Sequence, residues 1–145
     1  QFEGRKVRLP VFLGRRPVEP IDQKLKQFYE RLLAVLRHPV VRNGQWQLLE
    51  CDPAWEGNWT RDCFVAFAWQ GLDGERLLVA VNYAPNQSQC YVRLPFADLG
   101  NGHWRLQDLL GDTQYDRDGN DLKSRGLYLD VPPWQNNIFT MTRFS

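Results

Sequence analysis

RLLVAVNY, residues 76–83, is the stretch of sequence that decides the fold. Its apolar side chains occupy both sets of alternating positions, which predicts a strand that is buried on most of both faces and central in its sheet. The predicted partner strand is CFVAFAW, residues 63–69, because Gly71-Leu72-Asp73-Gly74 between the two strands is typical of a hairpin turn. An antiparallel pair therefore forms the centre of the predicted fold.

An alternation of apolar and polar side chains, with a period of two residues, begins at Gly44 and continues to the end of the chain. Beside the central pair it predicts strands at residues 45–50, 89–94, 103–109, 113–117, 127–131 and 138–144. About seven or eight short strands at this spacing are typical of an antiparallel all-β domain. We therefore expect a mainly β fold, an antiparallel two-layer β-sandwich of Greek-key-like topology, preceded by one amphipathic α-helix.

The predicted helix spans residues 20–38. Its apolar side chains recur at helical spacing and form one stripe, made of Ile21, Leu25, Phe28, Leu32, Val35 and Leu36. Pro20 fits the first helical position, Asp22 suits the positive end of the helix dipole, and His38-Pro39 ends the helix. Such a stripe needs an apolar surface to pack against.

Charge and hydropathy exclude two classes of partner. The 145 residues carry 18 Lys and Arg against 17 Asp and Glu, a net charge of +1. This balance argues against a nucleic-acid binder that relies on bulk electrostatics. No apolar run approaches the roughly 18 residues of a membrane-spanning helix, so we expect no membrane partner and a cytoplasmic location.

The residue types that hold metals are scattered. Cys51, Cys63 and Cys90 lack CxxC spacing, which favours reduced, buried thiols over a zinc site or a disulfide framework. Four aspartates gather in one segment, at Asp112, Asp116, Asp118 and Asp121. They supply half of the alternating oxygens of a calcium loop, so a solvated turn is the favoured interpretation and a calcium site the alternative. We expect no structural metal and no cofactor.

Tryptophan is the most informative residue type for binding. Trp46, Trp69 and Trp104 fall within predicted strands, and we expect them in the core. Trp55, Trp59 and Trp134 lie in predicted loops, where flat rings either stack on sugar faces or seal the ends of a small sandwich. Trp55 and Trp59 are the candidate carbohydrate-binding residues, with an expected affinity for maltoheptaose weaker than about 1 mM.

One stretch resembles a known family. Residues 28–41, FYERLLAVLRHPVV, followed by Gly44-Gln45-Trp46, are similar to a junction in α-amylase-type enzymes of glycoside hydrolase family 13. In that family the last helix of the catalytic (β/α)8 barrel leads there into a C-terminal all-β domain. Residues 77–84, 127–132 and 138–141 are similar to strands of that domain.

The resemblance implies a division of the chain and a role for each part. Residues 1–40 would be the tail of the catalytic barrel, a loop plus the last helix, and residues 41–145 the C-terminal β-sandwich. The implied function is that of a non-catalytic accessory domain, which packs against and stabilises the barrel of the same polypeptide. The residues expected to dock on the barrel are Leu25, Phe28, Leu32 and Leu36.

Catalysis is not expected from this chain. The family's catalytic Asp, Glu and Asp lie on earlier barrel strands, and no position here matches their motifs, so we predict no catalytic residues. The parent would be a glycosidase or transglycosidase acting on α-glucosidic bonds, and the truncated chain is expected to self-associate through its open stripe. Two alternatives remain: a starch-binding or α-glucan-binding β-sandwich module, and a plain protein-interaction β domain.

Overall fold

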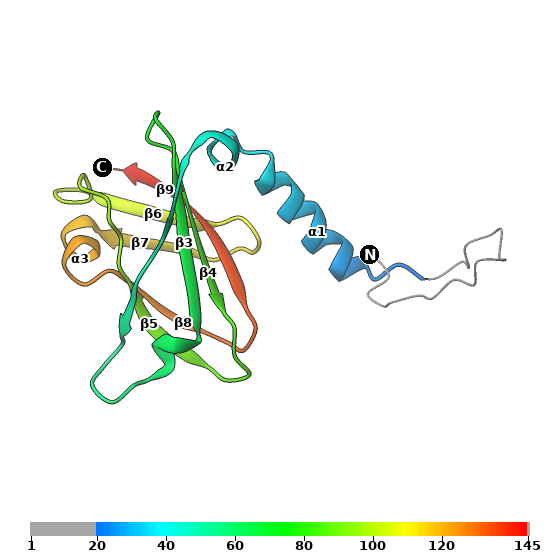
Figure 1. Cartoon of the computed structure of the whole chain (residues 1–145). Coiled ribbons are helices and arrows are strands. Elements are labelled where there is room, and N and C mark those ends of the chain that lie inside the picture. The colour runs from blue at the N-terminus through cyan, green and yellow to red at the C-terminus, as the bar shows by residue number, and fades with distance from the viewer. Residues whose placement is uncertain (1–19, 145) are drawn as a thin grey trace.

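The computed structural model describes residues 20–144 and contains two packed antiparallel sheets (Figure 1). The larger sheet has six strands, in the order β1 (Gln45–Leu48), β3 (Phe64–Gln70), β4 (Arg76–Asn82), β9 (Asn136–Phe144), β6 (His103–Asp108) and β7 (Gln114–Asp118). The smaller sheet has three, in the order β2 (Cys51–Pro53), β5 (Ser88–Val92) and β8 (Leu127–Val131). The sheets do not close into a barrel. The predicted mainly β, antiparallel two-layer fold is confirmed.

The predicted strand at residues 45–50 corresponds to β1 alone, and a short strand of the other sheet follows directly after it. β1 ends at Leu48 and pairs with β3, whereas β2 begins at Cys51 and pairs with β5. Between them Leu49 is buried, and its backbone N–H donates to the Ala66 carbonyl. An alternating pattern does not reveal such a crossing, because inward and outward side chains keep alternating through it.

Strand β4 has the central place that the sequence predicts. It pairs with β3 on one side and β9 on the other, and its residues from Arg76 to Ala80 are buried. Strand β9, the last in the chain, lies between β4 and β6. Tyr83 lies beyond the end of β4 and is 73% exposed, so the expectation that it continues the buried alternation is wrong.

The main core lies between the two sheets. Inward side chains of both sheets meet there, and the largest fully buried ones include Leu78, Leu106, Leu129 and Phe139. Trp104 is buried in this core, as expected, and its Nε1–H donates to the backbone carbonyl of Leu99 at 2.9 Å.

Helix α1 (Gln23–Leu36) is shorter than the predicted span of residues 20–38. Asp22 is its N-cap, because the Asp22 carboxylate accepts hydrogen bonds from the backbone N–H groups of Lys24 at 3.0 Å and Leu25 at 3.1 Å. An aspartate that satisfies free amides in this way fixes where a helix begins. Pro20 therefore lies before the cap and not at the first helical position.

Three further short helical segments were not predicted: α2 (Pro39–Asn43), α3 (Gly119–Ser124) and the 3-10 helix η1 (Thr60–Cys63). Pro39 does end α1, but it also begins α2, where proline suits the first turn. Segments this short show no complete apolar period, so pattern analysis cannot detect them. Among the helices of the described residues, none has the length and apolar character needed to cross a bilayer.

Candidate functional site

The outer face of the larger sheet is divided into an apolar half and a polar half. The outward side chains of β1, β3 and β4 are apolar, and the apolar surface continues onto β9. We call it the apolar half-face, and its residues are Trp46, Leu48, Val65, Phe67, Trp69, Leu77, Val79, Val81 and Ile138. Because these side chains are cross-strand neighbours on one face, they form one continuous surface.

Part of the apolar half-face is open to solvent. Trp46 is 55% exposed and Leu48 is 61% exposed, and both lie on the edge strand β1. The ring centroids of Trp46 and Phe67 are 6.0 Å apart, and those of Phe67 and Trp69 are 5.3 Å apart, so three rings form a row. The expectation that Trp46 belongs to the core is wrong. Soluble monomers rarely expose large contiguous apolar patches, which marks this face as a candidate interface.

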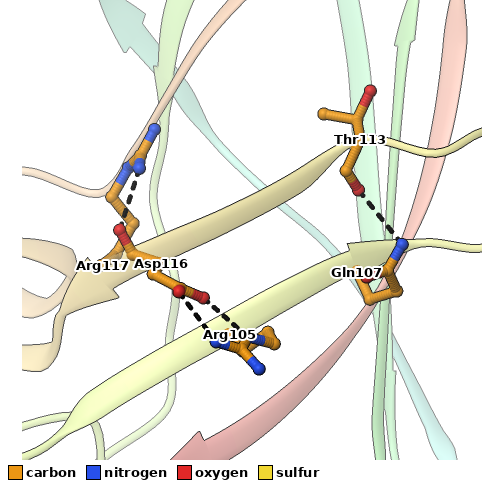
Figure 2. Close-up of polar contacts among 5 residues, drawn as sticks. All are labelled: Arg105, Gln107, Thr113, Asp116 and Arg117. Carbon is orange, nitrogen blue, oxygen red and sulfur yellow. Dashed lines mark hydrogen bonds and ion pairs between the residues drawn. The ribbon is translucent and has the colours of Figure 1, made fainter.

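Asp116 and Asp118, two of the four aspartates that were considered as calcium ligands, lie on β7 in the polar half of the same face. Asp112 precedes β7, and Asp121 lies on α3. Figure 2 shows Arg105 on β6 donating to both carboxylate oxygens of Asp116 on β7, at 2.8 and 2.9 Å. These hydrogen bonds keep the pKa of Asp116 below its ordinary value. The Asp118 carboxylate accepts from two backbone N–H groups in the first turn of α3. Within residues 20–144, no group of three or more His, Cys, Asp or Glu is arranged to hold a metal ion.

Helix α1 contacts the sandwich near its C-terminal end and projects away from it (Figure 1). Val35 of α1 and Val40 of α2 are buried against the apolar half-face. Further along α1, the Arg31 guanidinium donates from Nη1 to the backbone carbonyl of Leu110 at 2.8 Å. The N-terminal part of α1 therefore leads away from the β-sandwich.

The four predicted docking residues are incompletely covered by the sandwich. Leu25, Phe28 and Leu32 are half-buried, and Leu36 is exposed. Leu32 packs against the cluster on the half-face, while the Phe28 ring makes an edge-to-face contact with the ring of its neighbour Tyr29 at 5.7 Å. The stripe thus keeps apolar surface available, and its docking role remains a prediction.

The loop between β2 and η1 presents Trp55 and Trp59, and both indole rings are more than half exposed. Asn58 between them is engaged in holding the loop. Its Nδ2 donates to Oε1 of Gln89 at 3.0 Å, and its Oδ1 accepts from the Thr60 backbone N–H at 2.8 Å and from the Thr60 hydroxyl at 2.6 Å. Sugar binding by the two rings stays a prediction, with few polar groups to support it.

Sequence reasoning placed Trp134 in a loop but missed that its ring pairs with an exposed Tyr83. Tyr83 follows β4 and Trp134 lies between β8 and β9, and their ring centroids are 5.5 Å apart with planes at 88°. Tyr83 was assigned to the buried alternation of its strand. The turn residues Pro132-Pro133 directly before Trp134 are the signal that indicated exposure for that ring.

The three cysteines are free thiols. Cys51 on β2 is half-buried and Cys90 on β5 is buried. A hydrogen bond between the two thiols raises the pKa of Cys90 and lowers that of Cys51. Cys63 is buried, and its Sγ accepts a long hydrogen bond from the Asn86 amide at 3.9 Å.

Comparison with known proteins gives matches among solved structures. No protein-family model and no curated protein matches the chain. The chain is similar to two structures of trehalulose synthase MutB, one of a mutant enzyme and one of the enzyme from Pseudomonas mesoacidophila MX-45 in a monoclinic crystal form. In each case the identity is 18%, the TM-score is 0.47, and the match covers 81% of this chain and 18% of the other. The chain therefore spans less than a fifth of the length of the enzyme it matches.

Proposed function

We propose that this chain is a non-catalytic accessory domain of an α-glucan-active glycoside hydrolase of the α-amylase family. It packs against the (β/α)8 catalytic barrel of the same polypeptide and stabilises it. Residues 1–40 are then the tail of the barrel, and residues 41–145 are the C-terminal β-sandwich. The parent enzyme is a glycosidase or transglycosidase that acts on α-glucosidic bonds.

The sequence of the junction supports the family. Residues 28–41 with Gly44-Gln45-Trp46 are similar to the step from the last barrel helix into the all-β domain. In the structure, helix α1 is followed by α2 and then by β1, the first strand of the sandwich. This order of one amphipathic helix followed by an antiparallel sandwich is the order that the resemblance implies.

The observation that carries the proposal is the open apolar surface at α1. The sandwich covers Val35 near the C-terminal end of the helix, while Leu36 and part of Leu25 and Phe28 remain accessible. The exposed rings of the apolar half-face add to this surface. Burial of such side chains is worth about 25 cal/mol per Å² of apolar area, so a barrel packed there would gain stability from the contact.

The proposed lack of catalysis follows from the chemistry of glycosidic bonds. Their cleavage needs two opposed carboxyl groups, one of which acts as the general acid. Asp116 is held by Arg105, and Asp118 caps a helix, so these carboxylates have structural partners. We expect the pure chain to release no reducing sugar from soluble starch above a buffer control, and release at a higher rate would refute this part.

Hydrogen exchange of the α1 amides tests the docking. The chain is measured alone and within a longer polypeptide that carries a barrel upstream of it. We expect slower exchange over residues 23–36 in the longer polypeptide, and Phe28→Asp should restore fast exchange and lower its melting temperature. Leu33→Asp is the matched control, because Leu33 is an exposed leucine outside the stripe. Equal exchange in both contexts would refute barrel docking and favour a plain protein-interaction domain.

The isolated chain offers a simpler check of the same stripe. With the barrel absent, the open side chains should drive self-association, which light scattering detects as a mass above that of the monomer. Phe28→Asp should shift the chain toward the monomer, and Leu33→Asp should not. A strictly monomeric wild type would contradict this expectation.

A further inference from the structure

We propose that Tyr83 and Trp134 form a binding platform for a neutral α-glucan chain. The two residues lie on the β4–β5 and β8–β9 connections, at the end of the sandwich opposite α2 (Figure 1). The platform is therefore separate from the surface proposed to dock on the barrel. The choice of α-glucan as ligand depends on the proposed function, whereas the existence of the platform does not.

Both rings of the pair present a large accessible surface. Tyr83 is 73% exposed and Trp134 is 57% exposed, although their rings contact each other edge to face at 88°. Aromatic side chains are large apolar groups that are ordinarily covered when they can be. Perpendicular rings leave the face of one ring open while the other ring supports it from the side, which is an arrangement suited to stacking.

A buried asparagine fixes the two connections that carry the rings. The side chain of Asn82 is fully buried, and its Nδ2 donates to the carbonyls of Asn86 at 2.8 Å, Val131 at 3.0 Å and Pro132 at 3.0 Å. Its backbone N–H donates to the carbonyl of Gln135 at 2.9 Å. One residue thus ties the turn after Tyr83 to the turn that contains Trp134, so the platform is rigid before any ligand arrives.

The backbone at Trp134 is the second unusual feature. Its φ is +60°, in the left-handed region that bulky residues rarely adopt and that Gly or Asn tolerates better. Its N–H donates to the Ala84 carbonyl at 3.2 Å, which holds the turn in this conformation. Glycine or asparagine would adopt this turn with less backbone strain than tryptophan, so the presence of the indole ring requires an explanation.

The surroundings of the rings favour an uncharged ligand. Residues 83–87, YAPNQ, and residues 132–137, PPWQNN, contain no charged side chain. The Asp130 carboxylate at the end of β8 accepts hydrogen bonds from the side-chain amides of Gln87 at 2.7 Å and Gln89 at 3.0 Å. Aromatic rings next to neutral amides suit the C–H faces and hydroxyl groups of a sugar chain, and the two connections provide no cation to pair with a phosphate or a carboxylate.

NMR titration of the full chain with maltoheptaose tests the proposal. We expect the largest shifts at the Trp134 indole and at residues of the two turns. Trp134→Asn should weaken binding about tenfold or more, because it removes the ring while asparagine tolerates the positive φ. Tyr83→Phe keeps the ring and should keep most of the affinity, whereas Tyr83→Ala removes the ring and should abolish the affinity.

Controls separate binding from folding and from the other aromatic loop. Trp134→Asn should keep the melting temperature of the wild type, and Trp59→Ala, which removes an equally exposed indole, should leave the affinity unchanged. Shifts centred on Trp55 and Trp59, or undiminished affinity in Trp134→Asn, would overturn the platform. Shifts at Trp134 with a proline-rich peptide but not with maltoheptaose would overturn the glucan as its ligand. Neither result depends on α1, so the docking proposal stands or fails by its own exchange experiment.

Discussion

Replacing Asn82 by alanine should destabilise the sandwich by about 3 kcal/mol. The side chain is fully buried, and the two N–H groups of its Nδ2 are shared among the backbone carbonyls of Asn86, Val131 and Pro132, at 2.8 to 3.0 Å. A net hydrogen bond contributes roughly 1 kcal/mol, and a buried acceptor that loses its donor costs about 1–3 kcal/mol. The loss of the two N–H donors and the buried carbonyls left without them therefore set the scale of the destabilisation.

One contribution acts in the opposite direction. Oδ1 of Asn82 is buried without a hydrogen-bond partner within the described structure, so alanine also removes an unsatisfied acceptor. This relief keeps the expected loss near the lower end of the range that the broken hydrogen bonds would give. At about 2–4 °C per kcal/mol for a domain of this size, the melting temperature should fall by roughly 10 °C.

Asn82→Asp separates the hydrogen-bond argument from simple packing. Aspartate has nearly the same shape, but its carboxylate accepts where the amide donates, so it faces three carbonyl oxygens. Burial raises the pKa of such a carboxyl in the folded state above its unfolded value of about 3.9. The Asn82→Asp variant should therefore be most stable at low pH, and it should lose stability as the pH rises from the unfolded pKa to the folded pKa of this carboxyl.

Guanidinium unfolding followed by tryptophan fluorescence measures both variants. Asn136→Ala, at a half-buried position of β9, is the control and should cost well under 1 kcal/mol. A loss below about 1 kcal/mol for Asn82→Ala would refute the reasoning that this amide ties the two turns together. An Asn82→Asp variant whose stability relative to wild type does not change with pH would refute it as well.

Three further substitutions test the backbone and an ion pair. Gly126→Ala should lower the free energy of unfolding by more than about 2 kcal/mol, because φ at Gly126 is +90° and an added Cβ would lie 2.4 Å from the Val92 carbonyl oxygen. Gly74→Ala is the control, because φ there is +85° but an added Cβ would meet no atom within 4 Å. It should cost about 1 kcal/mol in the same chemical unfolding experiment. Hydrogen bonds from Arg76 lower the pKa of Asp98, so this carboxylate stabilises the fold above its unfolded pKa and the benefit is lost as the pH falls through the folded pKa. Urea midpoints should therefore show Asp98→Asn less stable than wild type near pH 6, with a difference that shrinks as the pH falls below the unfolded pKa, and a constant difference would contradict this.

Local patterns predicted much of the fold. The apolar character of both faces of β4 indicated its central place, and the change of period at Gly44 located the start of the strands. These signals are local, because the alternating apolar side chains of a strand and the apolar stripe of a helix both come from residues that are close together in the sequence. The predicted boundaries of the elements were less accurate where a single side chain fixes the boundary. The helix begins at Gln23 and not at residue 20, because the Asp22 side chain caps it.

The candidate sites depend on contacts that no local pattern contains. The sequence by itself determined the class of fold, the helix and the apolar stripe that includes Phe28. Only the tertiary structure decided that Trp46 lies on the outer face, that Tyr83 meets Trp134, and that Asn82 holds both turns. The physical reason is that exposure and ring contacts result from the pairing of strands far apart in the chain, whereas periodicity records only which side chains share a face.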